Sequence, residues 1–212
     1  MPYEDVLSVF NAGAVHVING SGDSLSAFLS QRWHQDSLDV PDVAQDRDLF
    51  GRALASGDFN GDGRRDLAIG VPFEDVQSTD EWGSTIDADD AGAVIVIYGS
   101  VTGLDASPGS SGRPGAKFFS KSVVGPPSYV PHEEDLYGFT LTAWDFNGSL
   151  TTDLAIGVPN HNVFRTAKAG AVHVLYGGFF VGLSGPGQIW TQDTTGILDE
   201  AEDLDTFGLA LY

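Results

Sequence analysis

The chain contains one segment twice. Residues 57–72 read GDFNGDGRRDLAIGVP, and residues 144–159 read WDFNGSLTTDLAIGVP. In each copy an acidic, glycine-containing stretch leads directly into the apolar run DLAIGV, and a proline follows. A short apolar run of this kind is typical of a strand, and proline ends it because proline cannot donate to a central ladder. The sequence therefore predicts a loop followed at once by a strand, at two places in the fold.

Three further markers recur in a fixed order around these segments. Aromatic segments occupy 31–33, 117–119 and 188–190; aromatic–glycine pairs are Phe50-Gly51, Tyr137-Gly138 and Phe207-Gly208; AGAV occupies 12–15, 91–94 and 169–172. The aromatic segment and the following pair are 17 or 18 residues apart in each unit, whereas successive pairs are 87 and 70 residues apart. Rigid short strands joined by variable loops give this pattern, which favours an all-β fold of four-stranded antiparallel β-propeller blades.

The phase of the repeat predicts a partial array of about three blades. Residues 1–6, MPYEDV, align with residues 71–76, VPFEDV, so we expect a piece of a larger propeller. Residues 1–30 would be the C-terminal part of a blade, 31–110 and 111–185 two repeats, and 186–212 the start of another. An open array leaves two apolar blade faces uncovered, so self-association is expected.

Charge and composition exclude several classes of function. The chain has 30 acidic and 10 basic residues and a formal net charge of −20, which argues against nucleic acid as a partner. No run approaches the length of about 18 apolar residues that a membrane span needs. The absence of cysteine excludes disulfides and thiolate metal sites. The first residues, MPYEDVLSVF, show no signal peptide.

The acidic loop of the first copy has the spacing of an oxygen-rich cation site. Asp58, Asn60 and Asp62 alternate, a glycine follows the third, and Asp66 lies further along. Calcium takes many oxygen ligands at flexible distances, so this loop suits Ca²⁺. An EF-hand or dockerin-like loop begins in the same way, but its twelfth position must be acidic and is Ile69 here. The carboxylates could also cap a turn without metal.

With these motifs the chain resembles the FG-GAP repeats of integrin alpha-subunit propellers and their bacterial relatives. Phe50-Gly51 opens a unit, and Gly92-Ala93-Val94 closes it. The resemblance implies a propeller, commonly seven-bladed, with calcium loops on its lower face. It also implies an extracellular or cell-surface location and a role in adhesion or ligand binding. The calcium ligands that it implies are Asp58, Asn60, Asp62, Asp66 and the carbonyl of Arg64.

The second loop departs from this motif. Asp145, Asn147 and Asp153 match, but Ser149 replaces the third acidic ligand and Leu150 replaces the glycine. A ligand set with less charge binds calcium less tightly. We therefore expect the second loop to bind calcium more weakly than the first, or not at all.

For the other candidate residues, the sequence favours a structural role or a solvated surface position over a functional site. His16 and His173 share a repeat position with Ile95, which predicts a packed strand position rather than a ligand. Trp82 lies in a long insert, residues 74–90, for which surface decoration is favoured over binding. Acidic residues precede each aromatic–glycine pair and are interpreted as solvated loops rather than acid–base pairs. They are Asp46, Asp48, Glu133, Glu134, Asp135, Glu202, Asp203 and Asp205.

Three functions are compatible with these features. The favoured one is a non-catalytic, calcium-binding module that binds an unidentified protein or glycan, because no G-x-S-x-G elbow, P-loop or Ser-x-x-Lys motif is present. The second is the accessory propeller of a larger secreted hydrolase, such as a phospholipase or a glycan-active enzyme. The third is a lectin-like propeller with repeated sugar pockets.

Overall fold

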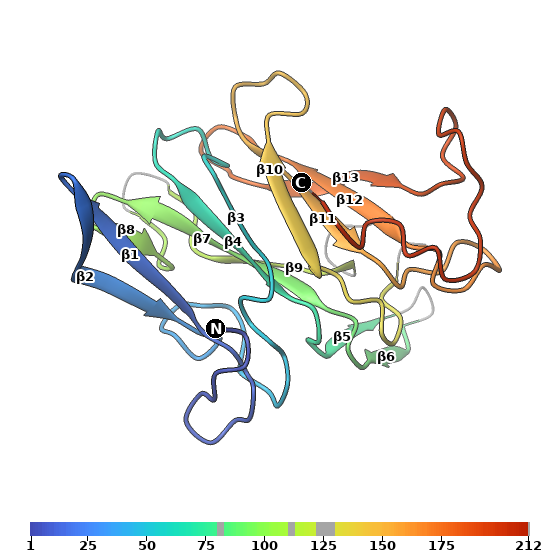
Figure 1. Ribbon diagram of the computed structural model, residues 1–212, viewed down its shortest axis with the longest axis horizontal. Helices are drawn as coiled ribbons and strands as arrows, with labels where there is room; N and C mark the ends of the chain where they lie inside the picture. The colour runs from blue at the N-terminus through green and yellow to red at the C-terminus, as the bar shows by residue number, and fades with distance from the viewer. Residues whose placement is uncertain (80–82, 110–112, 122–129, 212) are drawn as a thin grey trace.

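The computed structural model describes residues 1–79, 83–109, 113–121 and 130–211, and within them the chain forms four antiparallel sheets (Figure 1). Three of these sheets follow one another as blades. Blade 1 contains β1 (Val15–Ser21) and β2 (Ser24–Trp33). Blade 2 contains β3 (Leu54–Gly57), β4 (Asp66–Val71), β7 (Ala93–Ser100), β8 (Gly103–Asp105) and β9 (Lys117–Phe119). Blade 3 contains β10 (Thr140–Trp144), β11 (Asp153–Val158), β12 (Ala171–Tyr176) and β13 (Ser184–Trp190).

Blades 2 and 3 have the same strand order and register. In blade 2, β4 lies between β3 and β7, and β9 pairs with the other edge of β7. Blade 3 runs β10-β11-β12-β13. Ala68 pairs with Val96 in blade 2, and the equivalent Ala155 pairs with Val174 in blade 3. The expectation of an all-β fold built from four-stranded antiparallel propeller blades is confirmed.

The aromatic segments form the last strand of a blade. Trp33 pairs with Val15, Phe119 with Val94, and Trp190 with Val172. A sequence unit that starts at an aromatic segment is therefore offset by one strand from a blade, and the unit limits expected at 31 and 186 fall inside β2 and β13.

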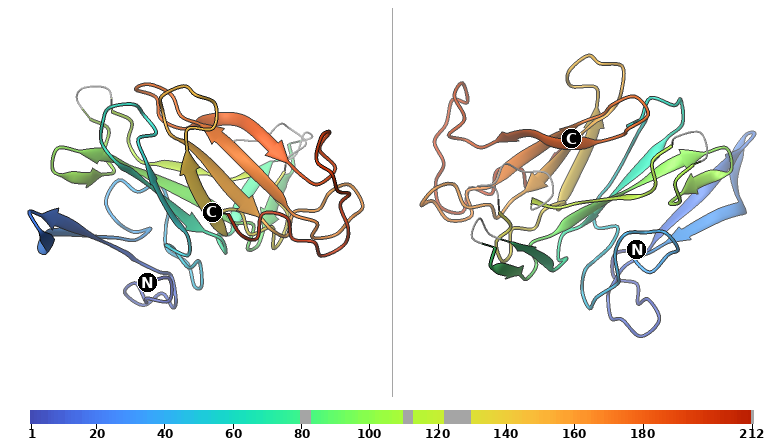
Figure 2. Two further views of the ribbon diagram at one scale, coloured as in Figure 1. Left: turned by 45° about the horizontal axis from the view of Figure 1, so that its top comes forward. Right: turned by 180° about the vertical axis from the view of Figure 1, so that it is seen from behind.

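The cores lie between the blades, because successive residues of the central strand face opposite neighbours. Val94 and Val96 pack with Leu154 and Ile156 of blade 3. Ile95 and Ile97 pack in a second cluster with Val15 of blade 1 and with Phe50 and Ile69. Figure 2 shows the three sheets arranged side by side in chain order. This packing of blade on blade is what the repeated apolar strands predict.

The aromatic–glycine and AGAV motifs meet where one blade joins the next. The N–H of Phe50 donates to the carbonyl of Ala12 at 2.8 Å. Tyr137 donates to Ala91 at 2.9 Å and Phe207 to Ala169 at 2.8 Å in the same way. Gly92, at φ +84, lies so close that a Cβ there would collide with the backbone of Tyr137. The two motifs are therefore the two halves of one backbone joint between adjoining blades.

Residues 1–4 occupy the repeat position of residues 71–74. Met1 exchanges backbone hydrogen bonds with Ala14, as Val71 pairs with Ala93. The carbonyl of Glu4 accepts from Gly13 at 2.8 Å, and that of Glu74 accepts from Gly92 at 2.9 Å. The far side of β1 is open, since Ile18 is 52% exposed while the equivalent Ile97 and Leu175 are fully buried. Ile18 therefore faces solvent on the side of β1 away from blade 2.

The insert of residues 74–90 contains a hairpin, which the sequence analysis did not predict. Its strands are β5 (Val76–Thr79) and β6 (Thr85–Ala88), and Val76 pairs with Ala88. Val76, Ala88 and Ala91 form a small buried cluster beneath it. Trp82, the candidate binding residue of this insert, lies outside the described residues.

Candidate metal centre

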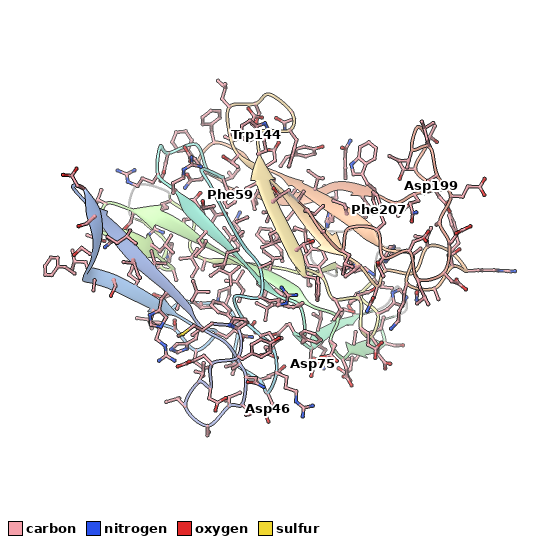
Figure 3. All side chains as sticks on the ribbon, in the orientation of Figure 1. Asp46, Phe59, Asp75, Trp144, Asp199 and Phe207 are labelled. Atoms are coloured by element: carbon pink, nitrogen blue, oxygen red, sulfur yellow. The ribbon has the colours of Figure 1, made fainter. Side chains whose placement is uncertain are left out.

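The two acidic loops lie side by side at one end of the blades. Residues 58–65 connect β3 to β4, residues 145–152 connect β10 to β11, and both loops project from the same end in Figures 1 and 2. The backbone N–H of Asp58 donates to Thr152 Oγ1 at 3.0 Å, and the N–H of Thr152 donates to the Asp58 carbonyl at 2.9 Å. Figure 3 shows Trp144, the residue before the second loop, at this end. The loops therefore form one continuous surface.

In the first loop, the oxygens of three side chains accept hydrogen bonds from the loop's own backbone and hold it in a tight turn. The carboxylate of Asp58 accepts from the N–H groups of Asp62 at 3.0 Å and Gly63 at 2.9 Å. Asn60 Oδ1 accepts from Asp62 at 3.1 Å, and Asp62 Oδ1 accepts from Arg64 at 2.9 Å. The bonds of Asn60 and Asp62 are Asx turns, in which a short side chain accepts from the N–H two residues on, whereas Asp58 reaches across to residues four and five further on. These bonds bring the oxygens of Asp58, Asn60 and Asp62 into one tight turn.

Asp66 lies beneath this turn and is 1% exposed. Its carboxylate accepts from the backbone N–H of Phe59 and from that of Gly99, both at 2.8 Å. Burial raises the pKa of Asp66 to about 7, and the negative charges of Asp62 and Asp58 also raise it. The two backbone hydrogen bonds lower this pKa and offset part of the increase. A cation nearby would favour the charged carboxylate.

The sequence-predicted ligands are thus close together but do not surround one point. Arg64 lies on the rim, with its guanidinium 3.8 Å from Asp62 Oδ2 and its side chain 43% exposed. In the described part of the chain, no three His, Asp or Glu side chains are disposed to hold a metal ion. The donor set fits calcium by its chemistry, because every donor is a hard oxygen. Each carboxylate oxygen that accepts an N–H also has a second lone pair for a cation.

The second loop has the same backbone with different side chains. Asp145 accepts from Ser149 and Leu150, both at 3.0 Å, and Asn147 Oδ1 accepts from Ser149 at 2.8 Å. Asp153 is fully buried and accepts from the N–H groups of Phe146 and Gly177, both at 2.9 Å. The loop therefore closes without the third carboxylate.

Two positions distinguish the second loop from the first. Ser149 Oγ lies 2.8 Å from Thr151 Oγ1, where the first loop has the charged side chain of Asp62. Leu150 has a φ of 73°, close to the 83° of the equivalent Gly63, so a leucine occupies a left-handed conformation. Its side chain is 84% exposed and gains little from packing. The second loop therefore offers less charge to a cation and adopts a costlier backbone conformation.

His173 is a packed strand residue, as the sequence analysis predicted. It is fully buried in β12, its Nε2 lies 2.8 Å from the carbonyl of Pro186, and its Nδ1 lies 3.1 Å from the hydroxyl of Tyr137. The equivalent Ile95 is also fully buried, whereas His16 faces solvent on the open side of blade 1.

The interpretation of the acidic runs as solvated loops is wrong for Asp48 and Asp135, which are both 1% exposed. Each accepts a hydrogen bond from the side chain two residues after the preceding aromatic strand. Gln35 Nε2 lies 2.8 Å from Asp48, and Lys121 Nζ lies 2.6 Å from Asp135. Both aspartates stand two residues before an aromatic–glycine pair, and this shared offset is the sequence signal that could have identified them.

The comparisons with known proteins agree with the repeat. The family model of the FG-GAP repeat matches residues 50–97, from the Phe50-Gly51 pair to Ile97 in β7, and this segment includes the first acidic loop. A search of the curated proteins gave no match for the chain. Among the described residues, no helix is long and apolar enough to cross a membrane. Residues 50–97 therefore match the FG-GAP repeat, which is a β-propeller repeat, and they contain β3, β4 and most of β7 of blade 2 together with the β5–β6 hairpin.

Proposed function

We propose that this chain is a calcium-binding, non-catalytic propeller module that binds a protein or glycan outside the cell or at its surface. FG-GAP repeats are found in β-propeller modules of the adhesion type, and the family is typically extracellular or on the cell surface. The observation that carries the calcium proposal is the turn in which Asp58, Asn60 and Asp62 gather hard oxygens above the buried Asp66.

The ion would be held by Asp58, Asn60, Asp62, Asp66 and the backbone carbonyl of Arg64. Bound calcium would supply the positive charge that this group of carboxylates lacks. The loop also contacts its neighbours, because the carbonyl of Asn60 accepts from the N–H of Phe180 at 2.7 Å and Asp58 bonds Thr152. Ordering the first loop would therefore stiffen the end of blade 2 against blade 3.

The second loop is the weaker candidate. Asp145, Asn147, Ser149 and Asp153 supply two carboxylates, whereas the first loop supplies three. Since calcium affinity falls with ligand charge, the first loop would fill before the second.

Thermal unfolding with a chelator and with calcium tests the proposal. A ligand that binds only the native state stabilises it by about 2.7 kcal/mol at a hundredfold excess over Kd. We expect this gain in the unmodified chain and in Asp145→Asn, and its loss in Asp58→Asn. An unchanged melting temperature in calcium, with no heat of binding in calorimetry, would refute the calcium site.

Ligand binding is tested separately. We expect an array of glycans and surface proteins to give binding that calcium strengthens in the unmodified chain and not in Asp58→Asn. Hydrolysis of an arrayed lipid or glycan by the purified chain would contradict the non-catalytic assignment.

A further inference from the structure

A buried cluster of carboxyl groups joins blades 1 and 2 at the end away from the acidic loops. Gln35 Nε2 lies 2.8 Å from Asp48 Oδ2, 2.8 Å from Glu74 Oε2 and 3.1 Å from Asp42 Oδ2. We call these four residues the carboxylate node. Gln35, Asp48 and Glu74 are 0%, 1% and 4% exposed. Figure 3 shows Asp46 and Asp75, neighbours of the node in sequence, at the lower end, with Trp144 at the upper end.

The hydrogens available in the node are too few for three ionised carboxylates. An amide nitrogen carries two hydrogens, and an ionised carboxylate only accepts. Asp48 Oδ2 also accepts from the N–H of Gln45 at 2.7 Å, and Asp42 Oδ1 accepts from the N–H of Val43 at 2.9 Å. Glu74 Oε2 and Asp42 Oδ2 compete for the remaining amide hydrogen. The other charged groups that act on these carboxyls are Asp36 and Asp75, which are themselves acidic. Two buried negative charges with a third, partly exposed one at Asp42, and no cation among them, would be very costly.

At the junction of blades 2 and 3, a buried carboxylate is balanced by a lysine ammonium group. Lys121 holds the repeat position of Gln35, Asp135 that of Asp48, and His161 that of Glu74. Lys121 Nζ lies 2.6 Å from Asp135 and 3.1 Å from His161 Nδ1. Burial lowers the pKa of His161, so the imidazole is neutral at neutral pH and one ammonium balances one carboxylate. The carboxylate node has a neutral glutamine where this ammonium stands, and its amide nitrogen already fills the centre.

We propose that the carboxylate node holds a proton at neutral pH, shared between the carboxyls of Glu74 and Asp42, and that loss of this proton in alkaline solution loosens the junction of blades 1 and 2. Gln35 follows β2 of blade 1, and Glu74 follows β4 of blade 2, so the shared proton lies on the connection between blades. Burial, with the charges of Asp42 and Asp48, raises the pKa of Glu74 to about 10. Burial also raises the pKa of Asp48 to about 7.

The sign of the pH effect follows from these shifts. A carboxyl whose pKa is higher in the folded chain holds a proton that the unfolded chain has released. Its contribution to stability is complete below about pH 4.5, where the unfolded chain is also protonated, and is lost as the pH rises through the folded pKa of about 10. Across that window the equilibrium constant for unfolding rises by up to about tenfold per pH unit for one retained proton.

Glu74→Gln is the sharpest test, because its amide supplies a hydrogen at every pH. With a chelator and fixed salt present, we expect the variant and the unmodified chain to melt at similar temperatures near about pH 5. Near about pH 9 the variant should melt at the higher temperature, and the gap should widen steadily between these values. The matched control is Glu4→Gln, at the same repeat position but with its side chain 41% exposed, whose curve should stay parallel to that of the unmodified chain. Parallel curves for Glu74→Gln as well would overturn the proposal.

Two further measurements keep the proposal testable if that variant folds poorly. Carboxyl ¹³C NMR of the unmodified chain should show the Glu74–Asp42 pair still holding one proton at neutral pH, and titration of both carboxyls near their ordinary pKa would refute it. Gln35→Lys places the ammonium of the other junction in the node and should also flatten the alkaline loss of stability. If added sodium or calcium instead stabilised the unmodified chain in alkaline solution and not Glu74→Gln, the node would bind a metal cation and the proton assignment would be wrong.

Discussion

The loop between β3 and β4 and the loop between β10 and β11 make the same hydrogen bonds from their first and last aspartates, yet they differ at the third ligand position. Asp58 and Asp145 each accept from two N–H groups of their own loop. Asp66 and Asp153 each accept from one N–H group of the loop and from one near the end of the neighbouring strand, Gly99 in β7 or Gly177 after β12. The carboxylate of Asp62 is absent from the second loop, and the backbone is unchanged. The difference separates the aspartates on which both loops depend for their shape from Asp62, which bonds the N–H of Arg64 and adds a charge that the second loop lacks.

The largest effect should come from the buried aspartates, and it should be equal in the two loops. Asp66→Ala and Asp153→Ala each leave two backbone N–H groups without an acceptor, and each orphaned buried group costs about 1–3 kcal/mol. We therefore expect each variant to lose about 2–6 kcal/mol in urea unfolding with a chelator present. Asp62→Ala is the control and should lose much less. A large loss for one aspartate alone would show that the two loops are not built alike.

The next effect should come from converting the second loop into the first. Ser149→Asp with Leu150→Gly restores the third carboxylate and the glycine, so calorimetry should show tighter calcium binding at this loop. At a hundredfold excess over its Kd, the ion should add about 2.7 kcal/mol to stability. The measurement is best made in an Asp58→Asn background, where the first loop is disabled. If the native second loop bound calcium more tightly than the native first loop, the charge argument would fail.

A smaller effect should come from the left-handed residue alone. A non-glycine residue in this conformation costs about 1–2 kcal/mol, part of which glycine loses again through its freedom in the unfolded chain. In chelator, Gly63→Leu should cost about 1 kcal/mol, and Leu150→Gly should gain less than about 1 kcal/mol. Chemical denaturation of both variants checks the pair. Destabilisation by Leu150→Gly would mean that the leucine side chain stabilises the loop despite its exposure.

The smallest effect should come from the ion pair on the rim. Arg64 and Asp62 are partly exposed and 3.8 Å apart, and exposed pairs contribute about 0–1 kcal/mol. Arg64→Ala should therefore change stability in chelator by less than about 0.5 kcal/mol. Thr151→Ala at the equivalent position should cost more, because the Thr151 side chain is 1% exposed and its hydroxyl bonds Ser149 Oγ at 2.8 Å. Measuring both in low and high salt would expose a larger electrostatic role for Arg64, since screening would then weaken the unmodified chain selectively.

The sequence predicts those parts of the fold that depend on neighbouring residues. The two DLAIGV strands begin and end where the sequence places them, because an acidic loop and a proline bound each apolar run. The clustering of side-chain oxygens in the first loop can also be predicted, since an Asx turn joins residues only two positions apart.

Features that depend on distant residues could not be predicted in this way. Burial of Asp48 requires Gln35, and the node requires Glu74, which is 39 residues from Gln35. The strands of the β5–β6 hairpin, VQST and TIDA, are polar and too short for an alternating pattern to be recognised. The position of Lys121 is explained only when the two blade junctions are compared.

At each junction between blades, the backbone hydrogen bonds are the same, but the polar side chains beside them differ. Phe50, Tyr137 and Phe207 contact the preceding blade through backbone hydrogen bonds. Since these bonds do not depend on the side chain, any copy of the unit can form them. The polar groups beside them differ, with glutamine and carboxyls at one junction and lysine, aspartate and histidine at the next. Duplication of a unit would thus add a blade that connects at once, while its polar residues decide which neighbour suits it. In such an array the same backbone hydrogen bonds connect every pair of blades, and the polar side chains differ from one junction to the next.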